Sequence, residues 1–169
     1  RVRICLLFGG KSGEHEVSLN SAASVLQALD TSKYEVLPVA ISKEGQWLSP
    51  GKSLDYLESG ADKKFVASFE EKESDLDVQQ ALVVSPDSQP VDVVFPIMHG
   101  PYGEDGTLQG FLELVGVPFV GSDTLASALA MDKLMAKKIF IAEGIPTPKY
   151  WFFKKMIRRM FQVLRFLVL

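Results

Sequence analysis

The sequence predicts an α/β domain in which a Rossmann-like open parallel sheet is flanked by helices. Apolar, strand-like segments lie at 2–8, 34–41 and 91–98, and a helical spacing of apolar residues follows the first and the third. The loops directly after these two segments combine glycine, acids and histidine, at the edge where open α/β sheets bind their ligands. Of the 169 residues, 47% are hydrophobic and 23% are charged, which is typical of a globular domain with a buried core.

The first strand and helix are predicted within the first 30 residues. Residues 2–8 form a short apolar run bounded by two glycines, which favours a buried strand and is too short for a secretory signal. From Val17 to about Asp30, apolar or small residues recur at helical spacing. The single cysteine, Cys5, excludes a disulfide within the chain and indicates a buried, reduced thiol in a cytoplasmic protein.

The next segments predict a second strand and then a polar excursion. Residues 34–41 alternate as a strand does, and 46–48 resemble a short extended piece. Residues 51–90 are polar, charged and only weakly periodic. We therefore expect 51–90 to be an excursion between core elements, with its charged side chains in water.

Regular structure is predicted again from residue 91 onward. Residues 91–98 read as a strand, 108–115 as a helix and 117–121 as another short strand. Ser122 is a candidate N-cap for a single long helix that Gly144 would end. The lysines of this helix are expected to be solvated, and none of them indicates a function by itself.

The first glycine-containing loop does not match the common phosphate-binding motifs. In a Walker motif a glycine stands five residues before the Gly-Lys-Ser of 10–12, and Cys5 occupies that position. Generic phosphate binding at a helix start stays open. The acid–histidine–acid cluster at 14–16 has two interpretations: Glu14 binds a cationic ligand group such as an amine, or the acids favour the positive end of a helix dipole.

A second loop of similar composition lies at 99–107. It contains His99, Gly100, Gly103, Glu104, Asp105 and Gly106. The three glycines predict positive φ angles and close approach of the backbone. A single loop histidine is either a structural hydrogen-bonding residue or a catalytic one, but two such loops at the ends of two predicted strands are stronger evidence for a functional role than either loop alone.

Four separate motifs resemble the amino-terminal part of D-alanine–D-alanine ligases. The matching segments are GGKSGEHEVSLNSA at 9–22, FPIMHGPYGEDGTLQGFLELVGVPFVGS at 95–122, ASALAMDK at 126–133 and GIPTP at 144–148. Their order and spacing match the family through about residue 149. The resemblance implies the fold that precedes an ATP-grasp region, with a substrate-binding domain at 1–122 and a helix and entry to the ATP-grasp region at 123–149.

The resemblance also implies an activity. Family members use ATP and Mg²⁺ to join two D-alanines through an acyl phosphate, which supplies peptidoglycan for cell-wall biogenesis and cell shape. They are cytoplasmic, and they are generally homodimers through the first domain. D-Alanine and ATP are therefore the expected small-molecule partners, with ATP bound weakly or not at all by this chain alone. Nucleic acid is not expected, because the main body is acidic and the basic segment at 150–169 contains no motif that reads nucleic acid.

By matching motif, Glu14 and His99 are the implied catalytic residues. Glu14 would hold the ammonium of the first D-alanine, and His99 would lie near that substrate and the transferring phosphate. Ser18 would bind substrate by orienting Glu14, or would cap the first helix, and Lys133 would contact the nucleotide. The supporting positions are Gly9, Gly10, Gly103 and Glu104.

The resemblance is lost at 150–169, where five basic residues and no acid are found. Three interpretations of this tail are open: a truncated or out-of-frame end, a helix that packs on its own domain or on a second copy, and a basic amphipathic helix at a membrane surface. A membrane partner is not expected. No acid there could hold magnesium, so we expect no metal ligands in this chain and no turnover by it alone. The alternatives are a fragment of a D-alanine–D-lactate or D-alanine–D-serine ligase, or a non-catalytic binding module.

Overall fold

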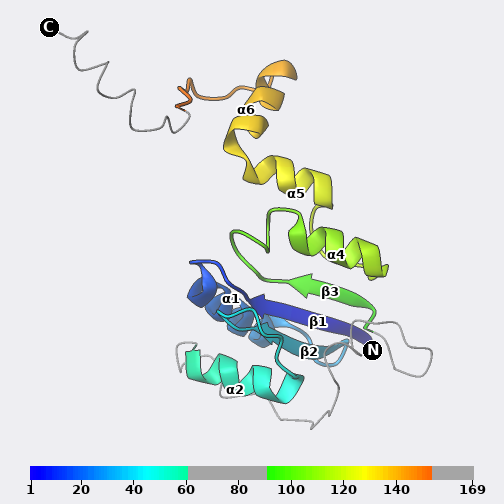
Figure 1. The fold of residues 1–169 in the computed structure, drawn as a ribbon. Coiled ribbons are helices and arrows are strands. Elements are labelled where there is room, and N and C mark those ends of the chain that lie inside the picture. Colours follow the sequence, from blue (N-terminus) through cyan, green and yellow to red (C-terminus); the bar gives the residue numbers. More distant parts are fainter. Residues whose placement is uncertain (61–90, 154–169) are drawn as a thin grey trace, which may run out of the picture. The chain divides into compact units, whose positions relative to one another are not determined.

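The computed structural model describes residues 1–60 and 91–153 (Figure 1). The chain forms two compact units, 1–131 and 132–169, and each is described by itself. The first unit contains β1 (Val2–Gly9), α1 (His15–Ala28), β2 (Tyr34–Ile41), α2 (Pro50–Gly60), β3 (Val93–Pro96), α4 (Thr107–Val115) and α5 (Thr124–Met131), and the second contains α6 (Lys133–Ala142). Residues 61–90 and the tail from 154 lie outside the described residues.

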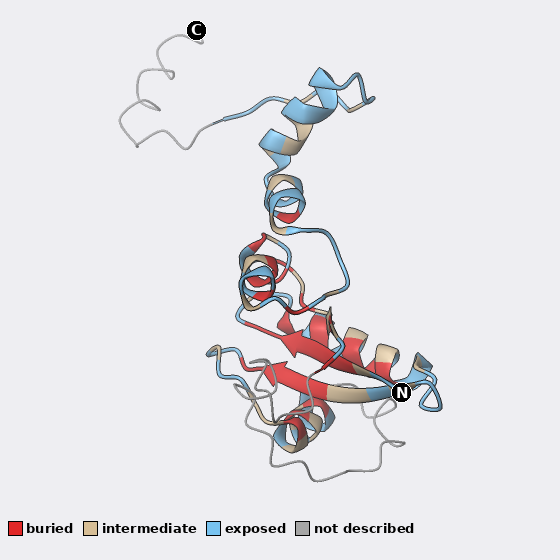
Figure 2. Ribbon diagram, turned by 90° about the vertical axis from the view of Figure 1, so that its right-hand side faces the viewer, coloured by how far each residue is buried: buried red, intermediate tan, exposed pale blue. Residues whose placement is uncertain are grey.

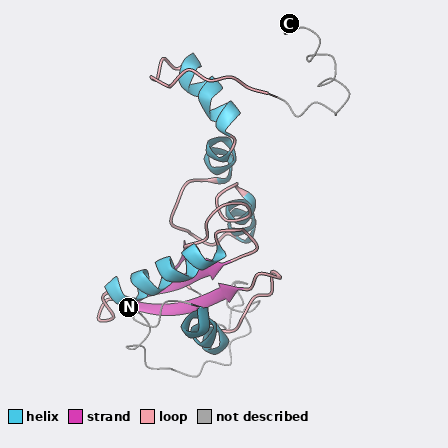
Figure 3. Cartoon of the chain, turned by 90° about the vertical axis from the view of Figure 1, so that its left-hand side faces the viewer, coloured by secondary structure: helices cyan, strands magenta, loops and turns pink. Residues whose placement is uncertain are grey.

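The sheet is three-stranded and parallel, with the order β2-β1-β3. Leu7 pairs with Val39 on one side and with Pro96 on the other, which makes β1 the central strand. Helices separate successive strands along the chain, as parallel connections require (Figure 3). The predicted α/β class with a parallel sheet and flanking helices is confirmed.

Successive side chains of β1 enter two separate parts of the core. The strand is buried along most of its length (Figure 2). Leu6 and Phe8 pack with α1 and α2, whereas Cys5 and Leu7 pack with β3 and α4. All four side chains are fully buried, so helices cover both faces of the strand. Burial raises the pKa of the Cys5 thiol to about 12, which keeps it neutral, in agreement with the predicted buried thiol.

The first ten residues of the predicted polar excursion form helix α2, so that expectation is wrong for this part. The Leu57 side chain is buried, and the Ser53 hydroxyl accepts a hydrogen bond from the Ala40 backbone N–H at 2.8 Å. This bond ties α2 to β2. The sequence did not reveal the helix because few of its residues are apolar, and a buried serine gives no periodic signal.

The predicted single helix after Ser122 is two helices, α5 and α6. Asp132 between them is extended, and its carboxylate accepts hydrogen bonds from the backbone N–H groups of Leu134 and Met135, which caps α6. At the start of α5, the carboxylate of Asp123 rather than Ser122 accepts a hydrogen bond from a free helical N–H group, that of Ala126. Gly144 follows α6 with φ +69°, which confirms the predicted end.

Two smaller predictions also differ from the structure. Residues 117–121 contribute only a single bridge, between Val94 and Phe119, rather than a strand. In the second unit, Lys137 is not freely solvated, because its Nζ donates to the Thr147 hydroxyl at 2.9 Å and lies 5.1 Å from the ring centroid of Tyr150. No helix in the described ranges is long and apolar enough to cross a membrane.

Candidate functional site

Two loops meet where β1 and β3 end. The first loop is defined here as residues 10–14 and the second loop as 97–106. Because β1 and β3 are adjacent and parallel, both loops leave the same edge of the sheet. The predicted position of both loops at the ends of strands is confirmed, and this edge is where open α/β sheets bind ligands.

Glycine geometry shapes the start of the first loop. Gly9 has φ +88°, and a Cβ at this position would overlap the carbonyl oxygen of Ile41. Gly10 has φ +98°, and its N–H donates to the same oxygen at 2.7 Å. A Cβ on Gly10 would lie 2.6 Å from Cε of Met98. Both positions therefore require glycine, which gives their expected supporting role a physical basis.

Ser18 lies beneath the loops and joins the two strands. Its buried hydroxyl accepts from the Gly9 N–H at 2.7 Å and donates to the Ile97 carbonyl oxygen. The expected helix-capping role is wrong, because α1 begins after Glu14 without a side-chain cap. Ser18 contacts Glu14 only through a backbone hydrogen bond of 3.1 Å. The hydroxyl fixes the separation of the two loops.

The acid–histidine–acid cluster of the first loop is divided between different environments. His15 is buried, with Nδ1 2.7 Å from the Gly10 carbonyl oxygen and Nε2 3.2 Å from the Tyr56 hydroxyl. Glu16 is exposed and pairs with Lys43. The hydrogen bond from Lys43 lowers the pKa of the Glu16 carboxyl and raises the pKa of Lys43. Of the three residues of the cluster, only Glu14 faces the second loop.

The Glu14 carboxylate lies against the backbone of Gly100. A Cβ on Gly100 would come within 2.6 Å of Glu14 Oε2, and Gly100 itself has φ +71°. Ser12 links the same two loops: its hydroxyl donates to the His99 carbonyl oxygen at 2.6 Å and accepts from the Glu14 N–H at 3.2 Å. The sequence prediction missed Ser12. Its bond to Glu14 is a short-range turn that the sequence could have indicated, but its bond to His99 spans 87 positions.

The second loop is held largely by its own residues. The Gly100 N–H donates to the Glu104 carboxylate at 2.6 Å, and the Glu104 N–H donates to the Gly100 carbonyl oxygen at 3.0 Å. This is the loop-supporting role expected for Glu104. Partial burial opposes ionisation of Asp105, but hydrogen bonds from the N–H groups of Tyr102 and Thr107 outweigh it and lower the pKa of the Asp105 carboxyl.

The glycines of the second loop differ from one another. Gly100 and Gly106 have positive φ, as predicted, whereas Gly103 does not. Gly103 is required for close approach instead, because a Cβ there would lie 2.6 Å from Cβ of Met98. Positive φ also occurs at Tyr102, which an L-residue adopts only with strain.

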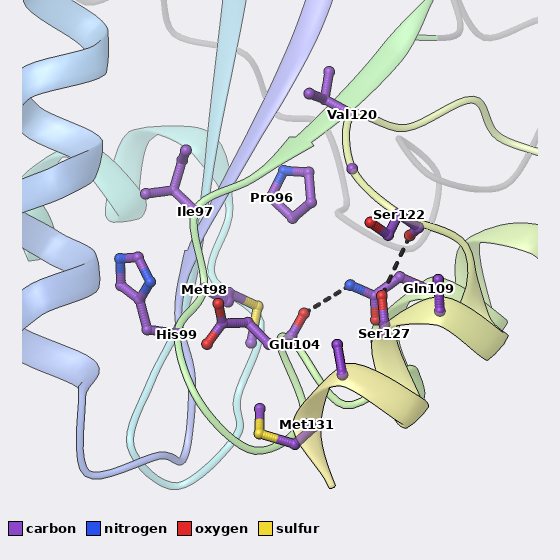
Figure 4. Close-up of a pocket in the computed structure, with 14 residues that line it drawn as sticks. Pro96, Ile97, Met98, His99, Glu104, Gln109, Val120, Ser122, Ser127 and Met131 are labelled. Carbon is purple, nitrogen blue, oxygen red and sulfur yellow. Dashed lines mark hydrogen bonds between the residues drawn. The ribbon is translucent and has the colours of Figure 1, made fainter. Parts of the chain in front are cut away.

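A pocket of about 480 Å³ opens beside the second loop (Figure 4). It is lined by Pro96, Ile97, Met98, His99, Gly103, Glu104, Gln109, Val120, Gly121, Ser122, Ala126, Ser127, Ala130 and Met131. Of the predicted functional residues, the pocket brings together His99, Gly103 and Glu104, and its lining does not include Glu14 or Ser18. Lys133 is the first residue of α6 in the second unit, and its contact with nucleotide stays a prediction.

The pocket wall contains one buried polar atom without a partner. The Gln109 side chain is buried, and its Nε2 donates to the Gly103 carbonyl oxygen at 2.8 Å. Within the described part of the chain, Gln109 Oε1 accepts no hydrogen bond. On the opposite side of the second loop, Nε2 of His99 lies 3.3 Å from the Ser21 hydroxyl of α1.

The edge of the sheet therefore carries carboxylates and an imidazole on a tightly fixed backbone. Carboxylates suit an ammonium group, and an imidazole can accept or donate a hydrogen bond according to its protonation. No group of three or more His, Cys, Asp or Glu side chains in 1–60 and 91–153 is placed to hold a metal ion. The described residues do not fit a magnesium site, and we derive no step through a metal.

Comparison with known proteins shows the family to which this chain belongs. The family described as D-ala D-ala ligase N-terminus matches residues 3–122, which include both loops. This chain belongs to that family. The D-alanine–D-alanine ligase of Natranaerobius thermophilus is 45% identical over 157 residues, covering 92% of this chain and 43% of that protein. The ligase of Deinococcus radiodurans is 49% identical over 144 residues, covering 85% of this chain and 39% of that protein.

Solved ligase structures share the fold. The VanG D-Ala:D-Ser ligase from Enterococcus faecalis is 36% identical, with a TM-score of 0.67 over 100% of this chain and 50% of that chain. The D-alanine–D-alanine ligase from Bacillus anthracis complexed with ATP is 31% identical, with a TM-score of 0.61 over 93% of this chain and 41% of that chain. The chain thus spans between 39% and 50% of the length of these four ligases.

Proposed function

We propose that this chain is the N-terminal, amino-acid-binding part of an ATP-dependent D-alanine–D-alanine ligase. The complete enzyme would convert two D-alanines and ATP to the dipeptide, ADP and phosphate through an acyl phosphate. Family membership over 3–122 supports the reaction class, and the relatives' names support the substrate. The observation that carries the proposal is the Ser12 bridge, which brings Glu14 and His99 together at one edge of the sheet.

In this proposal the Glu14 carboxylate holds the ammonium of the first D-alanine. Glu14 is exposed at the sheet edge, and its Oε2 lies against Gly100. Glu16, two residues later, is already paired with Lys43 and is therefore not available to a ligand. A charge-assisted hydrogen bond from ammonium to carboxylate is among the stronger polar contacts, so Glu14 would contribute much of the affinity.

His99 and Glu104 would serve the other end of the substrate. Both line the pocket beside the second loop, and Glu104 is committed to the Gly100 N–H. His99 would therefore be the side chain that lies near the carboxyl group on which the acyl phosphate forms, while Glu104 keeps the loop in place. Ser18 positions both loops from beneath and makes no contact with substrate in this proposal.

The remaining expectations are part of the same proposal. Residues 1–122 would be the substrate-binding domain and 123–149 the entry to the ATP-grasp region, where Lys133 would contact nucleotide phosphate. When bound, ATP supplies the phosphoryl group that activates the first carboxylate. Magnesium would be held by parts of the ligase outside the residues described here. We further propose a cytoplasmic homodimer that acts in peptidoglycan synthesis.

A D-alanine–D-serine ligase is the second candidate, and it is favoured by the similarity to VanG. Both candidates require the same first D-alanine, so the Glu14 site does not distinguish them. Mass spectrometry of the product formed by the complete ligase with D-alanine and D-serine in competition would separate the two. A D-alanyl-D-alanine product supports the first candidate, and a D-alanyl-D-serine product supports the second.

Calorimetric titration of D-alanine into the 169-residue chain tests the proposed site. We expect D-alanine to bind and L-alanine to bind at least several-fold more weakly. Glu14→Gln should weaken D-alanine about 10- to 100-fold, because a hydrogen bond to a charged group contributes about 1.5–3 kcal/mol. Glu16→Gln is the matched control and should change the affinity less than twofold. Equal affinities of the two variants would contradict the role of Glu14.

A further inference from the structure

We propose that Ser21 is a positioning residue that holds neutral His99 as the Nε2–H tautomer. The imidazole then presents an unprotonated Nδ1 to a ligand. Ser21 lies on the second turn of α1, within hydrogen-bond reach of the second loop 78 positions later in the chain.

The assignment follows from counting hydrogens around the Ser21 hydroxyl. This oxygen lies 2.8 Å from the Val17 carbonyl oxygen and 3.3 Å from Nε2 of His99. A hydroxyl has one hydrogen, and a carbonyl oxygen can only accept. The hydroxyl hydrogen therefore points to Val17, and the hydrogen between Ser21 and His99 must belong to Nε2.

The other side of the His99 ring is available to a ligand. Nδ1 of His99 has no hydrogen-bond partner among residues 1–60 and 91–153, and the residue lines the pocket. In Figure 4 the ring lies between α1 and the backbone of the second loop. With Nε2 protonated, neutral His99 is an acceptor at Nδ1 and becomes a donor there only as the imidazolium.

The second histidine of the chain is held in the opposite tautomer. The sequence contains two histidines, His15 and His99. Nδ1 of His15 faces the Gly10 carbonyl oxygen, which only accepts, so Nδ1 carries the hydrogen and Nε2 accepts from the Tyr56 hydroxyl. Each histidine therefore serves as an internal reference for the other.

The consequence for the site rests on the proposed function. Neutral His99 accepts a hydrogen bond from the ligand, such as one from the substrate ammonium or from a protonated carboxyl group. It does not donate to a phosphoryl oxygen in that state. The carboxylates of the two loops are Glu14, Glu104 and Asp105. The tautomer thus decides which polar groups of a ligand His99 can contact.

Long-range ¹H–¹⁵N NMR of the histidine-labelled chain tests the tautomers directly, at a pH where both rings are neutral. We expect the Nε2–H pattern for His99 and the Nδ1–H pattern for His15. Ser21→Ala should convert His99 to a mixture of tautomers and leave His15 unchanged. Alanine favours helices, so the variant keeps α1. Ser21→Thr retains the hydroxyl and should restore the single pattern.

Ser24→Ala is the matched control. Ser24 makes the same bond to the carbonyl four residues earlier, 2.9 Å to Asn20, on the same helix, and makes no contact with either histidine. It should leave both patterns unchanged. An Nδ1–H pattern for His99 in the unmodified chain, or a His99 pattern that Ser21→Ala does not alter, would overturn the proposal.

The same sample separates this inference from the proposed function. The tautomer patterns are recorded without ligand, so they stand or fall independently of substrate. Addition of D-alanine should then shift the Nδ1 resonance of His99. Confirmed tautomers with no response to D-alanine would retain the role of Ser21 and contradict D-alanine as the ligand.

Discussion

The two loops at the edge of the sheet are stabilised in different ways. The first loop depends on residues elsewhere in the chain, because Gly10 bonds to Ile41 and Ser12 bonds to His99. The second loop depends mainly on itself, through bonds from Glu104 to Gly100 and from Asp105 to Tyr102. It is also joined to the rest of the chain by the hydroxyls of Ser12 in the first loop and of Ser18 and Ser21 in α1. Two further bonds come from outside these serines: the Ile97 N–H donates to the Leu7 carbonyl oxygen, and Nε2 of Gln109 donates to the Gly103 carbonyl oxygen.

The difference indicates how the site is assembled. The second loop can adopt its shape when its own residues meet, whereas the first loop reaches its shape only after β2 and β3 have joined β1. Three serine hydroxyls then hold the second loop in place, against the first loop through Ser12, the end of β1 through Ser18 and α1 through Ser21. Substitutions in the first loop should therefore act on stability and on the site together, and substitutions in the second loop should act more locally.

The largest effect is expected from Gly9→Ala. The added Cβ would overlap the Ile41 carbonyl oxygen at a left-handed φ of +88°, which combines about 1–2 kcal/mol of backbone strain with about 1–3 kcal/mol of overpacking. Gly13→Ala is the control in the same loop, because a Cβ there meets nothing within 4 Å and φ is not positive. Urea unfolding of both variants measures the free energies. Equal free energies of unfolding for the two variants would show that Gly9 is no more required than Gly13.

A smaller loss is expected from Ser18→Ala. The substitution leaves the Gly9 N–H and the Ile97 carbonyl oxygen without their buried partner, at a cost of about 1–3 kcal/mol. Ser24→Ala on the exposed face of the same helix should change the free energy of unfolding by less than about 0.5 kcal/mol. Thermal or urea unfolding compares them, and a Ser18→Ala chain as stable as the control would show that the two strand ends do not need this link.

Ser12→Ala should affect ligand binding more than stability. Its hydroxyl is only partly buried, so its loss costs about 0.5–1.5 kcal/mol of folding free energy. The loops would no longer be tied together, and we expect D-alanine affinity to fall several-fold in calorimetry. If stability falls but the affinity for D-alanine is unchanged, the Ser12 hydroxyl does not align the two loops for binding.

The smallest expected effect is on the stability of the folded chain at low pH. Because hydrogen bonds lower the pKa of Asp105 in the folded chain, its stabilisation is present above the ordinary carboxyl pKa of 3.8 and is lost as the pH falls towards the lowered value. Asp105→Asn should therefore reduce the loss of stability below about pH 4, by less than about 1 kcal/mol because the carboxylate is largely exposed. Unfolding free energies at pH 3 and pH 6 measure this. An identical acid sensitivity in the variant would contradict it.

Local signals explain what the sequence could predict of the site and fold. Strand and helix periodicity indicated the parallel sheet, and the glycine and acid composition of both loops indicated a ligand edge. The bonds of Ser12, Ser18 and Ser21 span 78 to 87 positions, and no local pattern identifies such partners. Helix α2 was missed because a buried serine replaces the expected apolar residue. The break at Asp132 was missed because its capping role competes with a continuous helical spacing.

The most direct test of the two-loop site is an amide NMR titration of the ¹⁵N-labelled chain with D-alanine, with L-alanine as the control. We expect the largest shifts at Ser12, Glu14, His99 and Gly100, in both loops together and with D-alanine only. Under the same conditions, Glu14→Gln should abolish these shifts. Shifts confined to one loop, shifts outside both loops, or equal responses to the two enantiomers would contradict a D-alanine site formed by the pair.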